Sequence, residues 1–313
     1  MFGVPTQRSL QVGVYLATDG IAIAEVNLSA EPRPTLHSCH FIETDQPEER
    51  LAQLGRYVRE HALKRSYCVV VMDESSYNLI QMSAPPVQDD ELAAALRWSV
   101  KDLIDYPIDD AVIDVFRVPV QEHREAKVYA VVAPRGEIQQ TVDFIRKSGL
   151  RIESIDIEQL SIGNIVEQLE GQEKGIAVLH IDREHGSINL YQNSALYLSR
   201  KIDTGLARFE ALQAQGVDMQ NDAESIYEPI ILELQRSLDF YEHQFAKPSI
   251  RRLLVAPRNP LLQSFCDYAS SSTGLQVEFL NLGQVYPDST ALDDQGQTNC
   301  LLAIAAASRL PVS

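Results

Sequence analysis

The sequence lacks the residue patterns of several large protein classes. Its four cysteines form no C-x-x-C pair and have no pair of histidines beside them, which excludes the common zinc and thiol-redox motifs. No apolar run approaches the roughly 18 residues that cross a bilayer. The first residues carry no charged-then-apolar secretion signal. We therefore expect a cytoplasmic protein whose cysteines stay reduced.

Basic side chains are also scarce. The chain has 27 Lys and Arg residues against 44 Asp and Glu residues, a net charge of −17. Such a charge repels nucleic acid and anionic lipid head groups unless the fold assembles a basic patch. The densest basic stretches are mere pairs, Lys64-Arg65 and Arg251-Arg252. Neither nucleic acid nor direct insertion into a membrane is therefore expected.

What the sequence does contain is a repeated arrangement. At 313 residues and 45% hydrophobic composition, the chain is long enough for about two domains. Residues 12–28 and 176–200 both read as an apolar strand, a polar corner and a second alternating strand. After each pair the order of helix and strand patterns recurs with little residue identity. The repeat predicts two related α/β lobes. Two helices are expected in the second: one over 227–245 with a core stripe, and an apolar, alanine-rich core helix over 298–310. The stripe consists of Ile231, Leu234, Leu238, Tyr241 and Phe245.

A segment of different character interrupts the first half. A helix over 90–105 places Leu92, Leu96, Val100, Leu103 and Ile104 on an apolar stripe. Strands over 112–119 and 127–133 and a helix over 136–150 follow. The expected domains are a first lobe, a small αβ domain inserted in it, and a second lobe: 1–84 with 151–170, 85–150, and 171–313, respectively.

Three stretches carry a family resemblance. They are ELAAALRWSVKDLIDYPIDDAVIDV (91–115), ILELQRSLDFYEHQF (231–245) and LLAIAAASRL (301–310). In these the chain resembles the PilM group of pilus-assembly proteins, relatives of the division protein FtsA. Within that group the likeness is strongest to the component of the mannose-sensitive haemagglutinin (MSHA) pilus system. The resemblance implies the actin-like (RNase H-like) two-lobed ATPase fold with an FtsA/PilM-type inserted domain.

Active members of the actin-like superfamily hold ATP and magnesium between two hairpin corners that read roughly D-I-G-S-S-S, and a Gly-Gly turn admits the adenosine. On that pattern the positions of the aspartates and corner glycines fall on Tyr15, Ala17, His180 and Asp182, and the glycine turn falls on Pro257. Proline has no amide donor, and Asp182 and Glu184 oppose a polyphosphate by like-charge repulsion. We expect no catalytic residues, no ATPase activity and no cofactor. ATP binding is disfavoured but open, because Arg183 or His185 could offset part of the repulsion.

The second corner also contains an H-x-D-x-x-H pattern at 180–185. Side chains 180 and 182 share a strand face, but His185 lies past the corner, so the pattern predicts solvated turn residues and no metal site.

The resemblance further implies a partner. Proteins of this group bind the N-terminal cytoplasmic tail of a PilN-type bitopic inner-membrane protein, and we expect recruitment to the inner face of that membrane. The groove would involve residues 67–133, with Trp98, Tyr106, Phe116 and Arg117 as candidate contacts. Trp98 either packs on neighbouring strands or anchors an apolar peptide. The alternatives to such an adaptor are an ATP-binding switch and a polymerising element.

Overall fold

The computed structural model describes residues 10–30, 33–44, 46–119, 125–216, 218–219, 224–287, 289 and 292–310. The chain divides into two compact units. The first comprises the chain up to Ser161 together with the segment from Leu302 onward, and the second comprises Ile162–Leu301. Helix α4 (Glu158–Val166) runs along the chain from one unit into the other.

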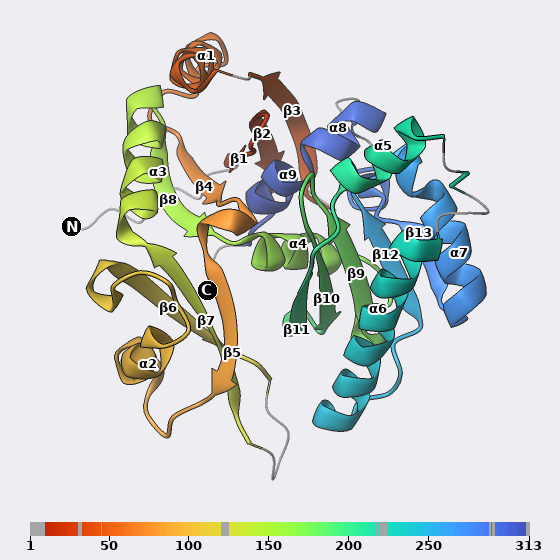
Figure 1. The fold of residues 1–313 in the computed structure, drawn as a ribbon. Coiled ribbons are helices and arrows are strands. Elements are labelled where there is room, and N and C mark those ends of the chain that lie inside the picture. The colour runs from red at the N-terminus through yellow and green to blue at the C-terminus, as the bar shows by residue number, and fades with distance from the viewer. Residues whose placement is uncertain are drawn as a thin grey trace. The chain divides into compact units, whose positions relative to one another are not determined.

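The first unit is built on a five-stranded sheet in the order β3-β2-β1-β4-β8 (Figure 1). Strands β1, β2 and β3 form an antiparallel meander, and β1, β4 and β8 are parallel. The bounds are β1 Leu10–Leu16, β2 Gly20–Asn27, β3 Thr35–Glu43, β4 Tyr67–Val71 and β8 Arg151–Asp156. The sheet is covered by α1 (Pro47–Glu60), α3 (Arg135–Ser148) and α9 (Leu301–Ala307).

Alternation along β1 assigns these helices to opposite faces. Val12 and Val14 belong to the core formed with α1 and α3, whereas Tyr15 packs with Ala306 of α9 on the other face. Gly13 allows α9 to approach the sheet closely, because a Cβ there would lie 1.9 Å from the carbonyl oxygen of Ala303. The small alanine side chains of α9 also allow the helix to lie close to the sheet.

A smaller antiparallel sheet in the first unit has the order β5-β7-β6. Its strands are β5 Asn78–Ser83, β6 Ala111–Arg117 and β7 Lys127–Pro134. Helix α2 (Leu92–Lys101) covers one face with the buried side chains of Leu92, Leu96 and Val100. The opposite face packs against residues of the larger sheet's connections, including Met72 and Ile157.

The second unit repeats the topology of the larger sheet. Its five strands have the order β11-β10-β9-β12-β13, again an antiparallel meander followed by parallel neighbours. The bounds are β9 Ile176–Ile181, β10 Gly186–Gln192, β11 Ala195–Ile202, β12 Arg252–Ala256 and β13 Gln276–Phe279. The helices are α5 Leu206–Ala214, α6 Glu224–Phe245, α7 Gln263–Thr273 and α8 Asp294–Asn299. The predicted repeat of two α/β halves is confirmed.

Three segments differ from the sequence-based expectation. Strand β5 joins the small sheet from before residue 85, and α3, which was placed in the inserted domain, contributes Ile145 to the core of the five-stranded sheet. The segment from Leu302 onward, expected in the second lobe, belongs to the first unit, because α9 packs against Gly13.

Two details of the expected helices are wrong. Helix α2 ends at Lys101, so Leu103 lies outside its buried stripe and is 54% exposed. The expected helix over 298–310 is instead two helices, α8 and α9. The stripe of α6, by contrast, is core as predicted: Leu238 is half-buried, and the other four residues are buried, namely Ile231, Leu234, Tyr241 and Phe245. None of the described helices is long and apolar enough to cross a bilayer.

Candidate functional site

Five residues singled out from the sequence lie at or beside the carboxyl ends of strands, where open α/β sheets bind ligands. Tyr15 and His180 are near the ends of β1 and β9, Ala17 and Asp182 lie just past those strands, and Pro257 directly follows β12. Tyr15 and Ala17 belong to the first unit and the other three to the second.

The corner of the first hairpin is held by its own unit. The carbonyl of Thr18 accepts a hydrogen bond from the Arg50 guanidinium of α1. The carbonyl of Asp19 accepts one from the amide of Thr44, at 3.1 Å. The side chains of Thr18 and Asp19 themselves face solvent.

Tyr15 meets a carboxylate that the sequence analysis missed. Its hydroxyl donates to Oδ2 of Asp73 at 3.4 Å. Oδ1 of Asp73 accepts from the amide of Ser75 at 3.0 Å and from the Ser75 hydroxyl at 2.5 Å. Asp73 thus caps the short 3-10 turn Glu74–Ser76. Its position at the end of the buried run YCVVVMD was a signal that could have identified it.

The corner of the second hairpin is closed by Asp182. Its Oδ1 accepts hydrogen bonds from the backbone N–H groups of Glu184 at 2.7 Å and His185 at 2.6 Å. The Asp182 amide donates to the His185 carbonyl at 3.0 Å. An aspartate that bonds to amides two and three residues ahead forms a self-contained Asx turn. The amides of this corner therefore already have an acceptor.

The start of α5 is fastened to the same corner. The amides of Leu206 and Ala207 donate to the carbonyls of Asp182 and Arg183, at 2.8 and 2.9 Å. Gly205 lies so close that a Cβ there would be 2.4 Å from the Arg183 carbonyl oxygen. These contacts use the first helix amides, which in other folds bind anions.

Carboxylates outnumber cations around this corner. The Arg183 guanidinium lies 3.9 Å from carboxylate oxygens of both Glu184 and Glu210. All three side chains are largely exposed, so each pair contributes little. His180 is buried in β9, beside Ser187 of β10 and Ala256 of β12, so the prediction that it is a solvated turn residue is wrong. Among the described residues, no cluster of three His, Cys, Asp or Glu side chains could hold a metal ion.

Polar groups of the turn after β12 are also bonded to other groups of the protein. Pro257 has no amide to donate. Oδ1 of Asn259 accepts from the Leu261 amide at 3.0 Å and caps the 3-10 turn Pro260–Leu262. The Thr298 hydroxyl donates to the Arg258 carbonyl at 2.7 Å.

A buried polar network lies at the ends of β4 and β8 and was not predicted. The Tyr77 hydroxyl donates to Oε1 of Gln159 at 2.8 Å and accepts from the Glu158 amide at 3.3 Å. Nε2 of Gln159 donates to Oε1 of Glu74 at 3.2 Å. Burial, with the nearby carboxylates of Glu158 and Glu74, raises the pKa of Tyr77 well above its usual value. Nothing in the local sequence pattern marks these residues, because they come from separate turns.

The candidate partner-binding residues do not form one site. Tyr106 lines a depression of about 500 Å³ with Asp110, Pro134, Arg135, Gly136 and Gln139. This depression lies where the segment after α2 enters β6 and where β7 passes into α3. No side chain caps the first turn of α3, and nothing lies within 4 Å of where a Gly136 Cβ would be. Burial raises the pKa of the Tyr106 phenol above its usual value.

Trp98 and Phe116 lie on different faces. Trp98 is 72% exposed on α2, with Lys101 Nζ 5.7 Å from its ring centroid, so the first of its two alternatives, packing onto neighbouring strands, is wrong. Phe116 is on the face of the small sheet away from α2, stacked on Tyr129 at 5.4 Å. One peptide segment bound on either face would therefore contact only one of these two rings.

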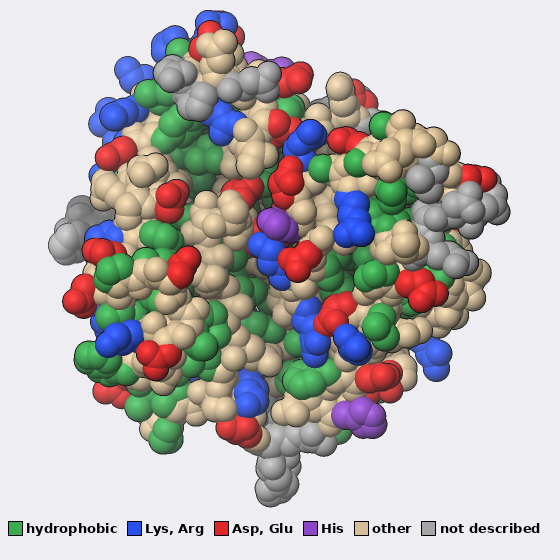
Figure 2. All heavy atoms as spheres, in the orientation of Figure 1, with side chains coloured by type: hydrophobic (Ala, Val, Ile, Leu, Met, Phe, Trp, Pro, Cys, Tyr) green, Lys and Arg blue, Asp and Glu red, His purple; other side chains and the backbone are tan. Residues whose placement is uncertain are grey.

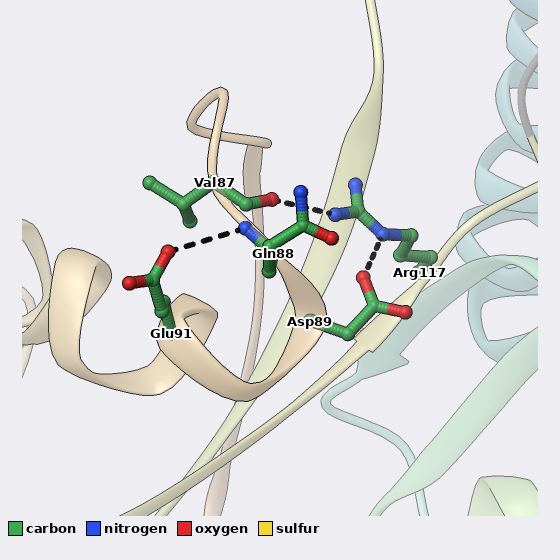
Figure 3. A network of polar contacts seen from close by, with 5 residues as sticks. All are labelled: Val87, Gln88, Asp89, Glu91 and Arg117. Carbon is green, nitrogen blue, oxygen red and sulfur yellow. Dashed lines mark hydrogen bonds and ion pairs between the residues drawn. The ribbon is translucent and has the colours of Figure 1, made fainter.

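Arg117 forms hydrogen bonds with the segment that leads into α2 (Figure 3). Its Nε donates to Oδ1 of Asp89 at 2.5 Å and its Nη2 donates to the Val87 carbonyl at 3.2 Å. Beside it the Gln88 amide donates to the Glu91 carboxylate, which forms a capping box at the start of the helical segment leading into α2. Arg117 thus ties the end of β6 to the start of α2.

Strand β6 lies at an edge of the small sheet, because among the described strands it has β7 as its one neighbour. Its main-chain groups on the outer side are a possible template for an added strand. One of them is already used: the Val115 amide donates to the carboxylate of the preceding Asp114, at 2.8 Å.

Sequence comparison decides the family. Residues 42–228, more than half of the chain, match the model described as type IV pilus assembly protein PilM. The chain belongs to the PilM family. No curated protein matches the sequence.

Solved structures agree with the PilM fold. The chain is similar to a structure titled PilM-PilN type IV pilus biogenesis complex, with a TM-score of 0.72, 20% identity, and coverage of 95% of this chain and 97% of that chain. A Bacteroides thetaiotaomicron protein with actin-like ATPase fold matches with a TM-score of 0.48 and 11% identity, covering 88% and 93%. The ethanolamine utilization protein EutJ from Carboxydothermus hydrogenoformans matches with 0.48 and 11%, covering 97% and 91%. The first of these shows that the chain has the fold of the PilM structure.

Proposed function

We propose that this PilM-family protein is a cytoplasmic adaptor of a type IV pilus assembly machine, specifically of the MSHA type, and that it is not an ATPase. It would bind the N-terminal tail of a PilN-type inner-membrane protein and so be recruited to the inner face of that membrane. The observation that carries the proposal is the family match over residues 42–228. The finer assignment is to MshI, the PilM-like component of the MSHA pilus system. It is supported by the stretches 91–115 and 231–245.

For the partner tail we propose the outer edge of β6 together with the depression beside Tyr106. An extended peptide gains main-chain hydrogen bonds along an edge strand, and pockets beside the strand select its side chains. The depression offers an aromatic side chain, the Arg135 cation and the uncapped first turn of α3. Such a surface suits an apolar side chain flanked by a carbonyl or carboxylate.

Loss of nucleotide binding is the second part of the proposal. A polyphosphate needs free backbone donors and compensation of its negative charge. The Glu184 and His185 amides instead donate to Asp182, and the first amides of α5 donate to the corner's own carbonyls. A phosphate at this corner would have to displace a carboxylate from its hydrogen bonds while lying beside it. These residues do not fit Mg-ATP.

Calorimetry tests the adaptor function. The probe is a synthetic peptide with the N-terminal cytoplasmic sequence of the PilN-type protein from the same organism. We expect saturable 1:1 binding to the wild type and at least a tenfold weaker affinity for Tyr106→Ala, because truncating an aromatic anchor costs on the order of 1–2 kcal/mol. Leu232→Ala, at an exposed side chain of α6, is the matched control and should leave the affinity unchanged. Absence of heat at high protein concentration would count against an adaptor.

Thermal melting with Mg-ATP separates this function from the alternative, an ATP-binding switch. A ligand at about 100 times its Kd adds about 2.7 kcal/mol to stability. We expect no shift of the melting temperature with millimolar Mg-ATP. A clear upward shift would establish the switch instead, whatever the peptide does.

A further inference from the structure

The fold assembles a basic surface that the sequence does not reveal. Seven exposed cations from separate segments meet at one edge of the first unit; we call this set the cationic edge. Its members are Arg56, Arg59, Lys64, Arg65, Arg146, Lys147 and Arg151. Figure 2 shows Lys and Arg side chains gathered over α1 and the neighbouring end of α3. They are seven of the 27 basic residues of a chain whose net charge is −17.

Backbone contacts bring these segments together. The Arg65 amide donates to the Gly149 carbonyl and the Arg151 amide donates to the Ser66 carbonyl, both at 2.8 Å. A Cβ at Gly149 would lie 3.9 Å from Cγ of Lys64. The last turns of α1 and α3 and the amino ends of β4 and β8 therefore converge, although about 85 residues separate them in sequence. Counting charges along the chain shows only isolated pairs.

These cations have no carboxylate partners. Among the described residues, none of the seven forms an ion pair. The Arg151 guanidinium lies over the ring of Tyr67 at 5.7 Å. Over residues 55–66 and 146–151 the only acidic residue is Glu60. The edge is thus locally and strongly positive.

Helix stability accounts for only part of the cluster. Arg59, Arg146 and Lys147 lie in the last turns of their helices, where cations interact favourably with the helix dipole. The other four lie on the exposed side of α1, in the connection to β4 and at the start of β8, and have no such role. At physiological ionic strength the Debye length is about 8 Å, so the acidic remainder of the surface is screened from a ligand held at this edge.

We propose that the cationic edge docks on the anionic phospholipid surface of a membrane. Long, exposed and unpaired Lys and Arg side chains suit a diffuse layer of head groups, where each contributes about 1 kcal/mol. Single-stranded nucleic acid binds through base stacking, and the rings near this edge are poorly placed for it: Tyr57 is buried, Tyr67 lies under Arg151, and the exposed His61 ring is already stacked on Tyr57 at 3.9 Å. An acidic peptide would favour fixed bidentate pairs, whereas within the described part of the chain no ion pair holds these seven side chains in place.

This membrane contact goes beyond the proposed adaptor function and does not need the partner. Electrostatic attraction alone gives reversible binding. Once a tail anchored in the same membrane is also bound, the two weak contacts reinforce each other through effective concentration. The cationic edge would then orient the adaptor on the bilayer.

Vesicle co-sedimentation of the full chain tests the proposal without any partner protein. The vesicles are phosphatidylcholine alone or with about 30% phosphatidylglycerol, at about 50 mM and about 500 mM salt. The edge variant carries Lys64→Gln, Arg146→Gln and Lys147→Gln. The matched control, Lys174→Gln with Lys201→Gln and Arg251→Gln, changes the net charge equally at exposed positions of the second unit. Melting temperatures verify that both variants are folded.

We expect the wild type and the control to bind only the anionic vesicles at low salt. The edge variant should bind roughly 100-fold more weakly, since each cation contributes about fivefold. Absence of wild-type binding, or equal loss in both triple variants, would overturn the proposal. A duplex DNA of about 30 base pairs is the last arm; binding to it without binding to vesicles would also overturn the lipid assignment. Because no tail peptide is present, failure here leaves the calorimetric test of the adaptor unaffected.

Discussion

Asp182 and His185 are joined by a 2.6 Å hydrogen bond from the His185 amide to the Asp182 carboxylate. The same Oδ1 accepts from Glu184. Two backbone donors of the hairpin corner therefore have an acceptor that the corner itself supplies.

Asp182→Ala should destabilise the second unit by about 1–2 kcal/mol, comparable to the loss of a helix cap, because two amides lose their acceptor. Asp182→Asn keeps an oxygen at the same place and should cost clearly less. Thermal melting of the two variants beside the wild type measures the difference. Equal melting temperatures for wild type and Asp182→Ala would mean that the turn does not depend on this carboxylate.

Gly13 should tolerate no side chain. A Cβ would lie 1.9 Å from the Ala303 carbonyl oxygen and 2.6 Å from the Ala307 amide, and both are backbone atoms that cannot rotate away. We expect Gly13→Ala to lower the free energy of unfolding by at least about 3 kcal/mol. Gly136→Ala is the control: it meets nothing within 4 Å and should be neutral or gain up to about 1 kcal/mol in helix propensity. Similar urea midpoints for the two variants would show that α9 does not pack here.

Much of the fold could be predicted from residue patterns. The two hairpin signals were strong because buried parallel and meander strands leave continuous apolar runs, and both sheets have the same strand order. Strand β5 was missed because its side chains are only half-buried and show little alternation. The place of α9 was missed because an apolar, alanine-rich helix fits either lobe, and only the contact at Gly13 decides between them.

The positions of the candidate site residues could be predicted from the sequence, but most of their hydrogen-bond partners could not. Tyr15, Asp182 and Pro257 do lie at or just past the ends of strands, because each strand ends where its apolar run in the sequence ends. The Asx turn at Asp182 had a local signal, an aspartate opening a polar corner. The Tyr77 network and the cationic edge had none, because their members meet only through tertiary packing.

Asp156 should make stability depend on pH. Burial raises its pKa above the ordinary value, despite opposition from the Arg309 guanidinium and the Ile157 amide. The folded state therefore holds this proton more tightly than the unfolded chain, so the contribution is complete at low pH and is lost as pH rises through the folded pKa.

Asp156→Asn should accordingly melt at a higher temperature than the wild type at pH 7. The difference should shrink as the pH falls toward the ordinary aspartate pKa of about 3.9. Arg309→Gln, which removes the compensating cation, should have the opposite effect at pH 7. A lower melting temperature for Asp156→Asn at neutral pH would show that the ion pair outweighs burial.

The four cysteines should differ sharply in reactivity. Burial raises the pKa of the Cys68 and Cys266 thiols to about 12. At pH 8 only roughly one in 10⁴ of each would be thiolate, the form that attacks disulfide reagents. Cys39, in β3, is only half-buried, and Cys300 is buried.

In the native protein at pH 8, an aromatic disulfide reagent should therefore modify Cys39 alone within minutes, and all four thiols should react in urea. Cys39→Ser is the matched variant and should leave the native protein without a fast phase. Rapid modification of Cys68 in that variant would mean that the five-stranded sheet of the first unit opens readily, because this thiol lies inside its core with α1 and α3.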